Sequence, residues 1–109
     1  MVFIEVELWA FRDAGKIRKV WIPNDQKLSL ANAYHFGQND FQPQAMRSVS
    51  CGDIIRFNGK RYMVWSIGFR RVPLDFTPDT NDPMLGYHSF GGKFTHATKN
   101  TTDNSLSNV

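Results

Sequence analysis

One dipeptide constrains the fold of this 109-residue chain more than any other feature. Asn58-Gly59 separates two short runs rich in β-branched and aromatic residues, 54–57 and 60–64. Asn-Gly favours a two-residue hairpin turn, because both turn positions need positive φ. The turn fixes the register and opposes Arg56 to Arg61. One face of the predicted hairpin then carries Ile55, Phe57, Tyr62 and Val64, and the other carries Ile54, Arg56, Arg61, Met63 and Trp65.

A second hairpin is predicted at the N-terminus. Residues 2–11 alternate between apolar side chains on one face and mostly polar or aromatic side chains on the other, which is the pattern of a half-buried strand. Residues 12–15 supply a turn, and residues 16–22 form the antiparallel partner. Glu5 and Glu7 share the face away from the core, where we expect a solvated surface near Arg18 or Lys19.

A short helix follows Pro23. Asn24, Asp25 or Ser29 is the expected N-cap, and Gly37 the expected end. Its apolar positions are Leu28, Leu30, Ala31, Ala33 and Tyr34. Residues 37–50 have no period and are expected to form an ordered loop, and residues 69–72 a last strand. The predicted fold is α+β: a small curved antiparallel sheet, or partly open β-barrel, of about five strands with one short helix.

The chain is long enough for one modest core. Composition predicts a compact α+β domain over 1–73, a glycine- and aromatic-rich extension over 74–97, and a mobile polar tail over 98–109. The extension is expected to dock on the domain or to engage a partner. No apolar run approaches the roughly 20 residues of a membrane span, so we expect no membrane association. The single cysteine, Cys51, excludes an internal disulfide and fits a reducing compartment.

Four stretches carry a resemblance to known proteins: GQNDFQP at 37–43, RSVSCGDII at 47–55, NGKRYMV at 58–64, and Gly68-Phe69. Together they resemble small uncharacterised proteins of bacteriophages, plasmids and other mobile elements and, more loosely, the YodL-like domain. Cys51 stands where that pattern has valine. The resemblance covers about a third of the chain. It implies a mobile-element accessory protein with no assigned reaction, in the cytoplasm, or the host cytoplasm if phage-encoded.

The net charge of +3 is unevenly distributed. Residues 16–71 carry ten Lys or Arg against three aspartates, a net charge of +7. Such a section favours phosphates or an acidic partner surface. The alternative is that these cations keep the strands soluble and discourage edge pairing.

The basic hairpin is the predicted binding surface. Its nucleic-acid or anion contacts are Arg56, Lys60, Arg61, Arg70 and Arg71, with Trp65 as a stacking surface. Opposed Arg56 and Arg61 repel each other unless an anion or carboxylate lies between them. In the alternative, Asp40, Asp53 or a tail aspartate neutralises the pair, or both side chains point into water. If they bind anions, replacing both by alanine preserves or slightly raises stability and weakens binding.

Two further features have competing interpretations. Gln38, Asn39 and Gln42, with Gln44 beside them, are candidate contacts to bases or peptide groups, but amides equally cap turns. Asp53, after Gly52, is expected to accept backbone N–H groups of the preceding turn, which is a fold signal more than a site.

No pattern favours an enzyme. Cys51 has no evident orienting group for nucleophilic catalysis. His35, His88 and His96 lack metal-ligand spacing with the cysteine, and Gly91-Gly92 lacks a phosphate-loop motif. We therefore expect no catalytic residue, metal or cofactor. The predicted function is a non-enzymatic phage or mobile-element accessory protein that binds nucleic acid. The alternative is a protein–protein inhibitor or adaptor acting on a host machine, for example in anti-defence, with exposed aromatic side chains as anchors. The predicted partner is accordingly nucleic acid or an acidic host protein.

Overall fold

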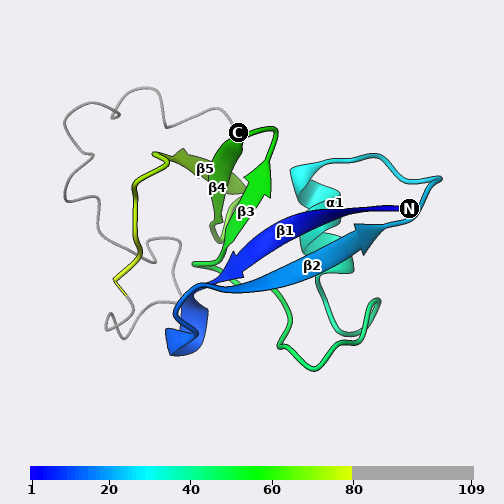
Figure 1. The fold of residues 1–109 in the computed structure, drawn as a ribbon, viewed down its shortest axis with the longest axis horizontal. Coiled ribbons are helices and arrows are strands. Elements are labelled where there is room, and N and C mark those ends of the chain that lie inside the picture. The colour runs from blue at the N-terminus through cyan, green and yellow to red at the C-terminus, as the bar shows by residue number, and fades with distance from the viewer. Residues whose placement is uncertain (80–109) are drawn as a thin grey trace.

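The computed structural model describes residues 1–79 (Figure 1), so the predictions for the 98–109 tail, most of the 74–97 extension, His88 and His96 lie outside the described residues. Five strands form one antiparallel sheet in the order β2-β1-β3-β4-β5, which does not close into a barrel. The elements are β1 (Val2–Leu8), β2 (Lys16–Ile22), α1 (Leu30–Phe36), β3 (Ile54–Phe57), β4 (Lys60–Val64) and β5 (Phe69–Val72). The predicted α+β fold is confirmed.

The register of the β3–β4 hairpin is the one its turn predicts. Phe57 pairs with Lys60 and Arg56 pairs with Arg61. Asn58 and Gly59 have φ of 54° and 75°, the positive values that this two-residue turn requires at both positions. Local sequence therefore placed two arginines directly across from each other.

The link between β1 and β2 has unusual backbone geometry. A short 3-10 turn, Ala10–Arg12, follows β1, and Phe11, Arg12 and Ala14 adopt φ between 54° and 64°. Residues other than glycine rarely adopt this left-handed backbone conformation, so surrounding contacts must hold the link in place.

Helix α1 begins and ends near the predicted residues. The Ser29 hydroxyl accepts a hydrogen bond from the backbone N–H of Asn32, as an N-cap does. Gly37 follows the helix, and a Cβ there would lie 2.5 Å from Val49 Cγ2, so glycine allows the returning loop to pack closely. The predicted apolar stripe is only partly correct, because Leu28 and Tyr34 are exposed while Ala33 is buried.

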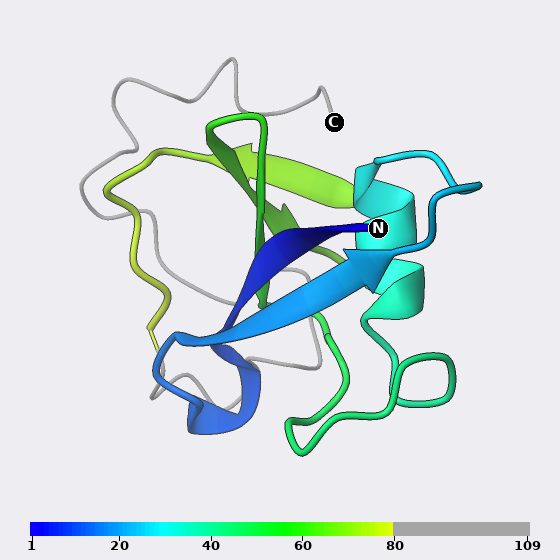
Figure 2. The same cartoon turned by 45° about the vertical axis from the view of Figure 1, so that its right-hand side comes forward.

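The sheet has two buried sides. The face that packs against α1 (Figure 2) is here called the helix face. It contains the main core, formed by Ile4, Val6, Leu8, Val20, Ile22, Ala33, Val49, Ile55 and Val64. On the opposite or outer face, Ile54, Met63 and Val72 form a second cluster with Phe76. The sequence alone grouped Ile54 and Met63 with the charged side of the hairpin. They are buried because packing continues past Pro73 to Phe76.

Candidate functional site

Glu7 lies between the two opposed arginines of the hairpin. It belongs to β1, which pairs with β3, and its side chain lies on the outer face of the sheet. Its carboxylate accepts hydrogen bonds from Arg56 Nε at 2.8 Å, Arg61 Nη2 at 2.7 Å and Trp9 Nε1 at 2.8 Å. Burial raises the pKa of the Glu7 carboxyl, but the hydrogen bonds from Arg61, Arg56 and Trp9 outweigh burial and hold it below the usual glutamate value.

The expected surroundings of Glu7 and the arginines were therefore wrong in two respects. Glu7 is buried rather than solvated, because β1 lies beside β3 and the Glu7 side chain faces the two arginines. Within the described residues, the carboxylates that neutralise the pair are Glu5 and Glu7, not Asp40 or Asp53. Arg61 also donates to the carbonyl oxygens of residues 73, 74 and 76, which fastens the covering segment to the hairpin.

The six predicted contact residues do not form one patch. Arg56, Lys60 and Arg61 line a groove of about 520 Å³ between the hairpin and the 74–77 segment. Arg70 lies with its guanidinium carbon 4.4 Å from the centre of the Trp65 ring, and Trp65 packs against the second cluster. Arg71 is exposed but alternates with the buried Val72, and so belongs to the helix face of the sheet.

The loop amides are used inside the protein. Gln42 accepts from Trp21 N and donates to Trp21 O, each at 2.8 Å, and Gln44 donates to Lys19 O. The backbone groups of Trp21 and Lys19 that accept or donate these bonds lie on the free edge of β2. The two glutamine side chains therefore take the place of a neighbouring strand. Gln38 donates to carbonyls of Tyr34 and Val49. These amides are thus engaged within the protein, at the end of α1 for Gln38 and along the edge of β2, rather than at a turn, for Gln42 and Gln44.

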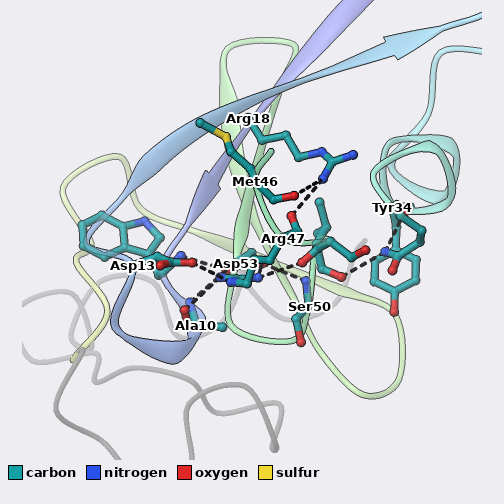
Figure 3. A network of polar contacts seen from close by, with 12 residues as sticks. Ala10, Asp13, Arg18, Tyr34, Met46, Arg47, Ser50 and Asp53 are labelled. Carbon is teal, nitrogen blue, oxygen red and sulfur yellow. Dashed lines mark hydrogen bonds and ion pairs between the residues drawn. The ribbon is translucent and has the colours of Figure 1, made fainter. Parts of the chain in front are cut away.

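Arg18 organises the same loop. It is fully buried, and its guanidinium donates to Asn39 Oδ1 and to the carbonyl oxygen of Gln42. It also donates to the carbonyl oxygens of Met46 and Arg47 (Figure 3). Part of the charge counted in the basic section is therefore structural. Alternation along β2 puts Arg18 on the same face as the buried Val20 and Ile22. Of the two cations expected near Glu5 and Glu7, only Lys19, opposite Glu5, therefore lies on their side of the sheet.

The buried Asp53 and the partly exposed Arg47 form a second polar network (Figure 3). Arg47 donates to both carboxylate oxygens of Asp53 at 2.8 Å and to Asp13 at 2.6 Å. Asp53 also accepts the backbone N–H groups of Trp9, Ala10 and Ser50. The expected bond to the preceding turn is confirmed at Ser50, whereas the bonds to Trp9 and Ala10 tie down the link between β1 and β2.

The exposed part of the outer face carries an aromatic patch that sequence reasoning missed. Phe3 and Trp21 are paired across β1 and β2 and are 40% and 39% exposed. Their rings meet edge to face at 4.9 Å, and Lys19 Nζ lies 5.0 Å from the Phe3 ring centre. Figure 1 shows α1 behind these strands and no other described element in front. We call Phe3, Trp21 and Lys19 the Phe3–Trp21 patch; the alternation of each strand contained the signal.

Cys51 has the surroundings of a packed thiol. It contacts the main core, and burial and then the nearby Asp53 carboxylate raise its pKa. The thiolate is the reactive form of cysteine, so a raised pKa slows alkylation. We expect iodoacetamide at pH 8 to modify Cys51 several-fold more slowly in the native protein than in urea-unfolded protein, measured by mass spectrometry. Equal rates would show that the thiol is freely accessible.

Comparison with known proteins adds nothing to this description of the site. Within residues 1–79, no three His, Cys, Asp or Glu side chains converge as a metal site would require. In the same part of the chain, no helix has the length and apolar character needed to cross a bilayer. No protein-family model, curated protein or solved structure matches this chain.

Proposed function

We propose that the protein binds single-stranded nucleic acid on the outer face of β1 and β2, as an accessory protein of a phage or other mobile element. The observation that carries the proposal is the Phe3–Trp21 patch, where two exposed rings on a sheet surface lie beside Lys19. Proteins that hold single strands combine aromatic rings, on which bases stack, with cations that follow the phosphates. The resemblance of residues 37–69 to mobile-element proteins supports the accessory role.

Charge next to the rings supports the same proposal. Arg56 lies one strand beyond Glu5 on the outer face, and its side chain is 47% exposed. Lys19 and Arg56 therefore flank β1 from both sides, each opposite Glu5. A strand whose bases stack on Phe3 and Trp21 would find a cation on either side. The amides Gln38, Asn39 and Gln42 are engaged internally, so sequence-selective reading of bases by them is not part of the proposal.

The proposal predicts a large loss of binding on removal of a ring. We expect Trp21→Ala to weaken binding of a 12-nucleotide oligothymidylate by roughly 5- to 150-fold, since stacking on one aromatic side chain contributes about 1–3 kcal/mol per base. Phe3→Ala should act in the same direction. Fluorescence anisotropy of the labelled oligonucleotide at several salt concentrations measures both, with thermal unfolding confirming that each variant is folded.

A matched control removes an exposed ring elsewhere. Phe41 is 58% exposed, and its ring stacks on His35 of α1, the helix that covers the opposite face of the sheet from the patch. Phe41→Ala should leave binding unchanged. Equal losses in Phe41→Ala and Trp21→Ala, or no loss in Trp21→Ala, would contradict the assignment of the site.

A protein interface is the second candidate for the same surface. Phe3 and Trp21 are themselves large exposed apolar side chains in contact with each other, and large aromatic side chains are frequent anchors at protein interfaces. This would suit an inhibitor or adaptor acting on a host machine. Salt separates the two functions: binding to nucleic acid weakens steeply as salt rises, and an aromatic-anchored protein complex does not.

A further inference from the structure

The two edges of the sheet differ in how their backbone groups are used. Strand β2 forms one edge and β5 forms the other (Figure 1). At the β2 edge, the Gln42 side chain bonds both the N–H and the carbonyl oxygen of Trp21, and Gln44 bonds a second carbonyl. At the β5 edge, no hydrogen bond from residues 1–79 takes this place. The protein therefore covers one edge and leaves the other open within the described part of the chain.

Strand pairing identifies the groups that point out of the β5 edge. The backbone N–H of Trp65 donates to the carbonyl oxygen of Gly68 at 2.9 Å, so Gly68 is bonded to the β4 side. Hydrogen bonding in an antiparallel pair alternates along each strand, so Arg70 is bonded to β4 as well. The backbone groups of Phe69 and Arg71 then point away from the sheet. Each of these two residues offers one donor and one acceptor to a further strand.

The side chains at the β5 edge indicate what kind of strand would fit. Phe69 and Arg71 both lie on the helix face, where Phe69 packs against the main core and Arg71 is exposed. Lys60 is exposed on the same face and is the diagonal neighbour of Arg71, since Arg71 pairs with Tyr62. Neither cation has an ion pair with any residue between 1 and 79. The β5 edge therefore presents positive charge beside an apolar ring.

We propose that the β5 edge binds an extended acidic segment of a partner protein, which joins the sheet as a further antiparallel strand. In this mode of recognition, main-chain hydrogen bonds provide affinity and alternate side chains provide specificity. A carboxylate would lie opposite Arg71, and an aromatic side chain two positions later would lie opposite Phe69. The Phe3–Trp21 patch lies at the other end of the strand order, so this surface is separate from the proposed nucleic-acid site.

Charge argues against a second copy of this chain in the same place. If both copies used Phe69 and Arg71, Phe69 of each copy would pair with Arg71 of the other. Arg70 of the two copies would then face each other at a non-hydrogen-bonded pair, where side chains approach most closely and like charges repel. An acidic strand meets no such repulsion.

A synthetic peptide tests the mode of binding. The sequence Ser-Val-Glu-Asp-Phe-Thr-Ser places its glutamate opposite Arg71 and its phenylalanine opposite Phe69. When the isotope-labelled full-length protein is titrated with it, we expect the amide NMR signals of Phe69 and Arg71 to shift most. N-methylation of the peptide's glutamate and phenylalanine, whose N–H groups face β5, should weaken binding about tenfold or more. N-methylation of its aspartate, whose N–H group points away, is the matched control and should leave the affinity nearly unchanged.

Substitutions in the protein separate the backbone from the charge. Arg71→Ala removes the charge and keeps the backbone donor, and it should weaken binding roughly two- to fivefold. Arg71→Pro also removes the outward N–H, which an edge strand tolerates, and it should weaken binding further. Lys27→Ala, at an exposed position before α1, is the charge control and should have no effect.

Several outcomes would overturn the proposal. Absence of peptide binding at millimolar concentration would do so, as would equal losses on N-methylation at all three positions. Self-association of the wild-type protein that Arg71→Pro abolishes would assign the β5 edge to a second copy instead. If Arg71→Pro does not fold, the N-methylated peptides decide the question. Oligothymidylate binding that is lost in Trp21→Ala but retained in Arg71→Ala would show that the two surfaces act separately.

Discussion

Replacing Asp53 by alanine is expected to lower the free energy of unfolding by about 3–5 kcal/mol, the largest effect of a single substitution that this structure predicts. Asp53 is fully buried and accepts hydrogen bonds from three backbone N–H groups and from Arg47. Alanine would leave Arg47 with Asp13 as its only described carboxylate partner and would leave the buried Ala10 N–H without its acceptor. The link at 10–14, with its left-handed residues, would lose its attachment at the same time.

Urea unfolding at pH 7 measures this change. Asp53→Asn is the informative companion, because asparagine keeps an oxygen acceptor but loses the charge, and we expect an intermediate loss. Asp40→Asn, an exposed carboxylate change, should stay within about 0.5 kcal/mol of wild type. A loss below about 1 kcal/mol in Asp53→Ala would mean that the Asp53 network contributes little to the folded state.

Replacing Glu7 by glutamine is expected to lower the free energy of unfolding by about 2–3 kcal/mol at pH 7, because the two arginines then face each other without the Glu7 charge between them. The figure is below that for a fully buried pair because the Arg56 side chain is half exposed. Since the Glu7 pKa is lowered in the folded protein, this contribution is present above the ordinary glutamate pKa of about 4.3. It is lost as the pH falls below that value towards the folded-state pKa.

The gap between wild type and Glu7→Gln should therefore shrink in acid. Thermal unfolding at pH 7 and at steps below pH 5 measures it. Glu5→Gln provides the control, since Glu5 is more exposed and its removal should change stability by less than about 1 kcal/mol. A gap that stays constant across this range would show that Glu7 does not stabilise the fold through its charge. The double change Arg56→Ala with Arg61→Ala, which the sequence predicted to preserve or slightly raise stability, should instead destabilise the protein because it leaves Glu7 buried without its cations.

Several features followed directly from local sequence. The Asn58-Gly59 turn determined the Arg56–Arg61 pairing, because its two positive φ values leave one register. Alternation placed Ile4, Val6 and Leu8 in the core. Ser29 capped α1 as one of the three expected residues. These signals act over a few residues, so no knowledge of the distant chain was needed.

The candidate site depended on strand order, which period-two patterns do not specify. Every strand of this kind has the same alternation, so nothing in the sequence placed β1 beside β3 and thus Glu7 between the hairpin arginines. The Phe3–Trp21 patch was implicit in the first hairpin, but its exposure depends on which face α1 covers.

The sequence by itself thus determined the two hairpins, the register of the β3–β4 hairpin, the helix and the α+β class, because short-range backbone preferences and periodicity specify them. Only the tertiary structure decided which charged side chains are paired within the protein and which remain exposed to a ligand. The sequence does not distinguish Arg18, Arg47 and Arg61 from an exposed lysine such as Lys60. In the structure, each of the three arginines donates to a carbonyl oxygen at least 12 positions away. Arg47 also pairs with the buried Asp53. Burial of a charge requires such partners, and only the folded chain brings them within hydrogen-bonding distance.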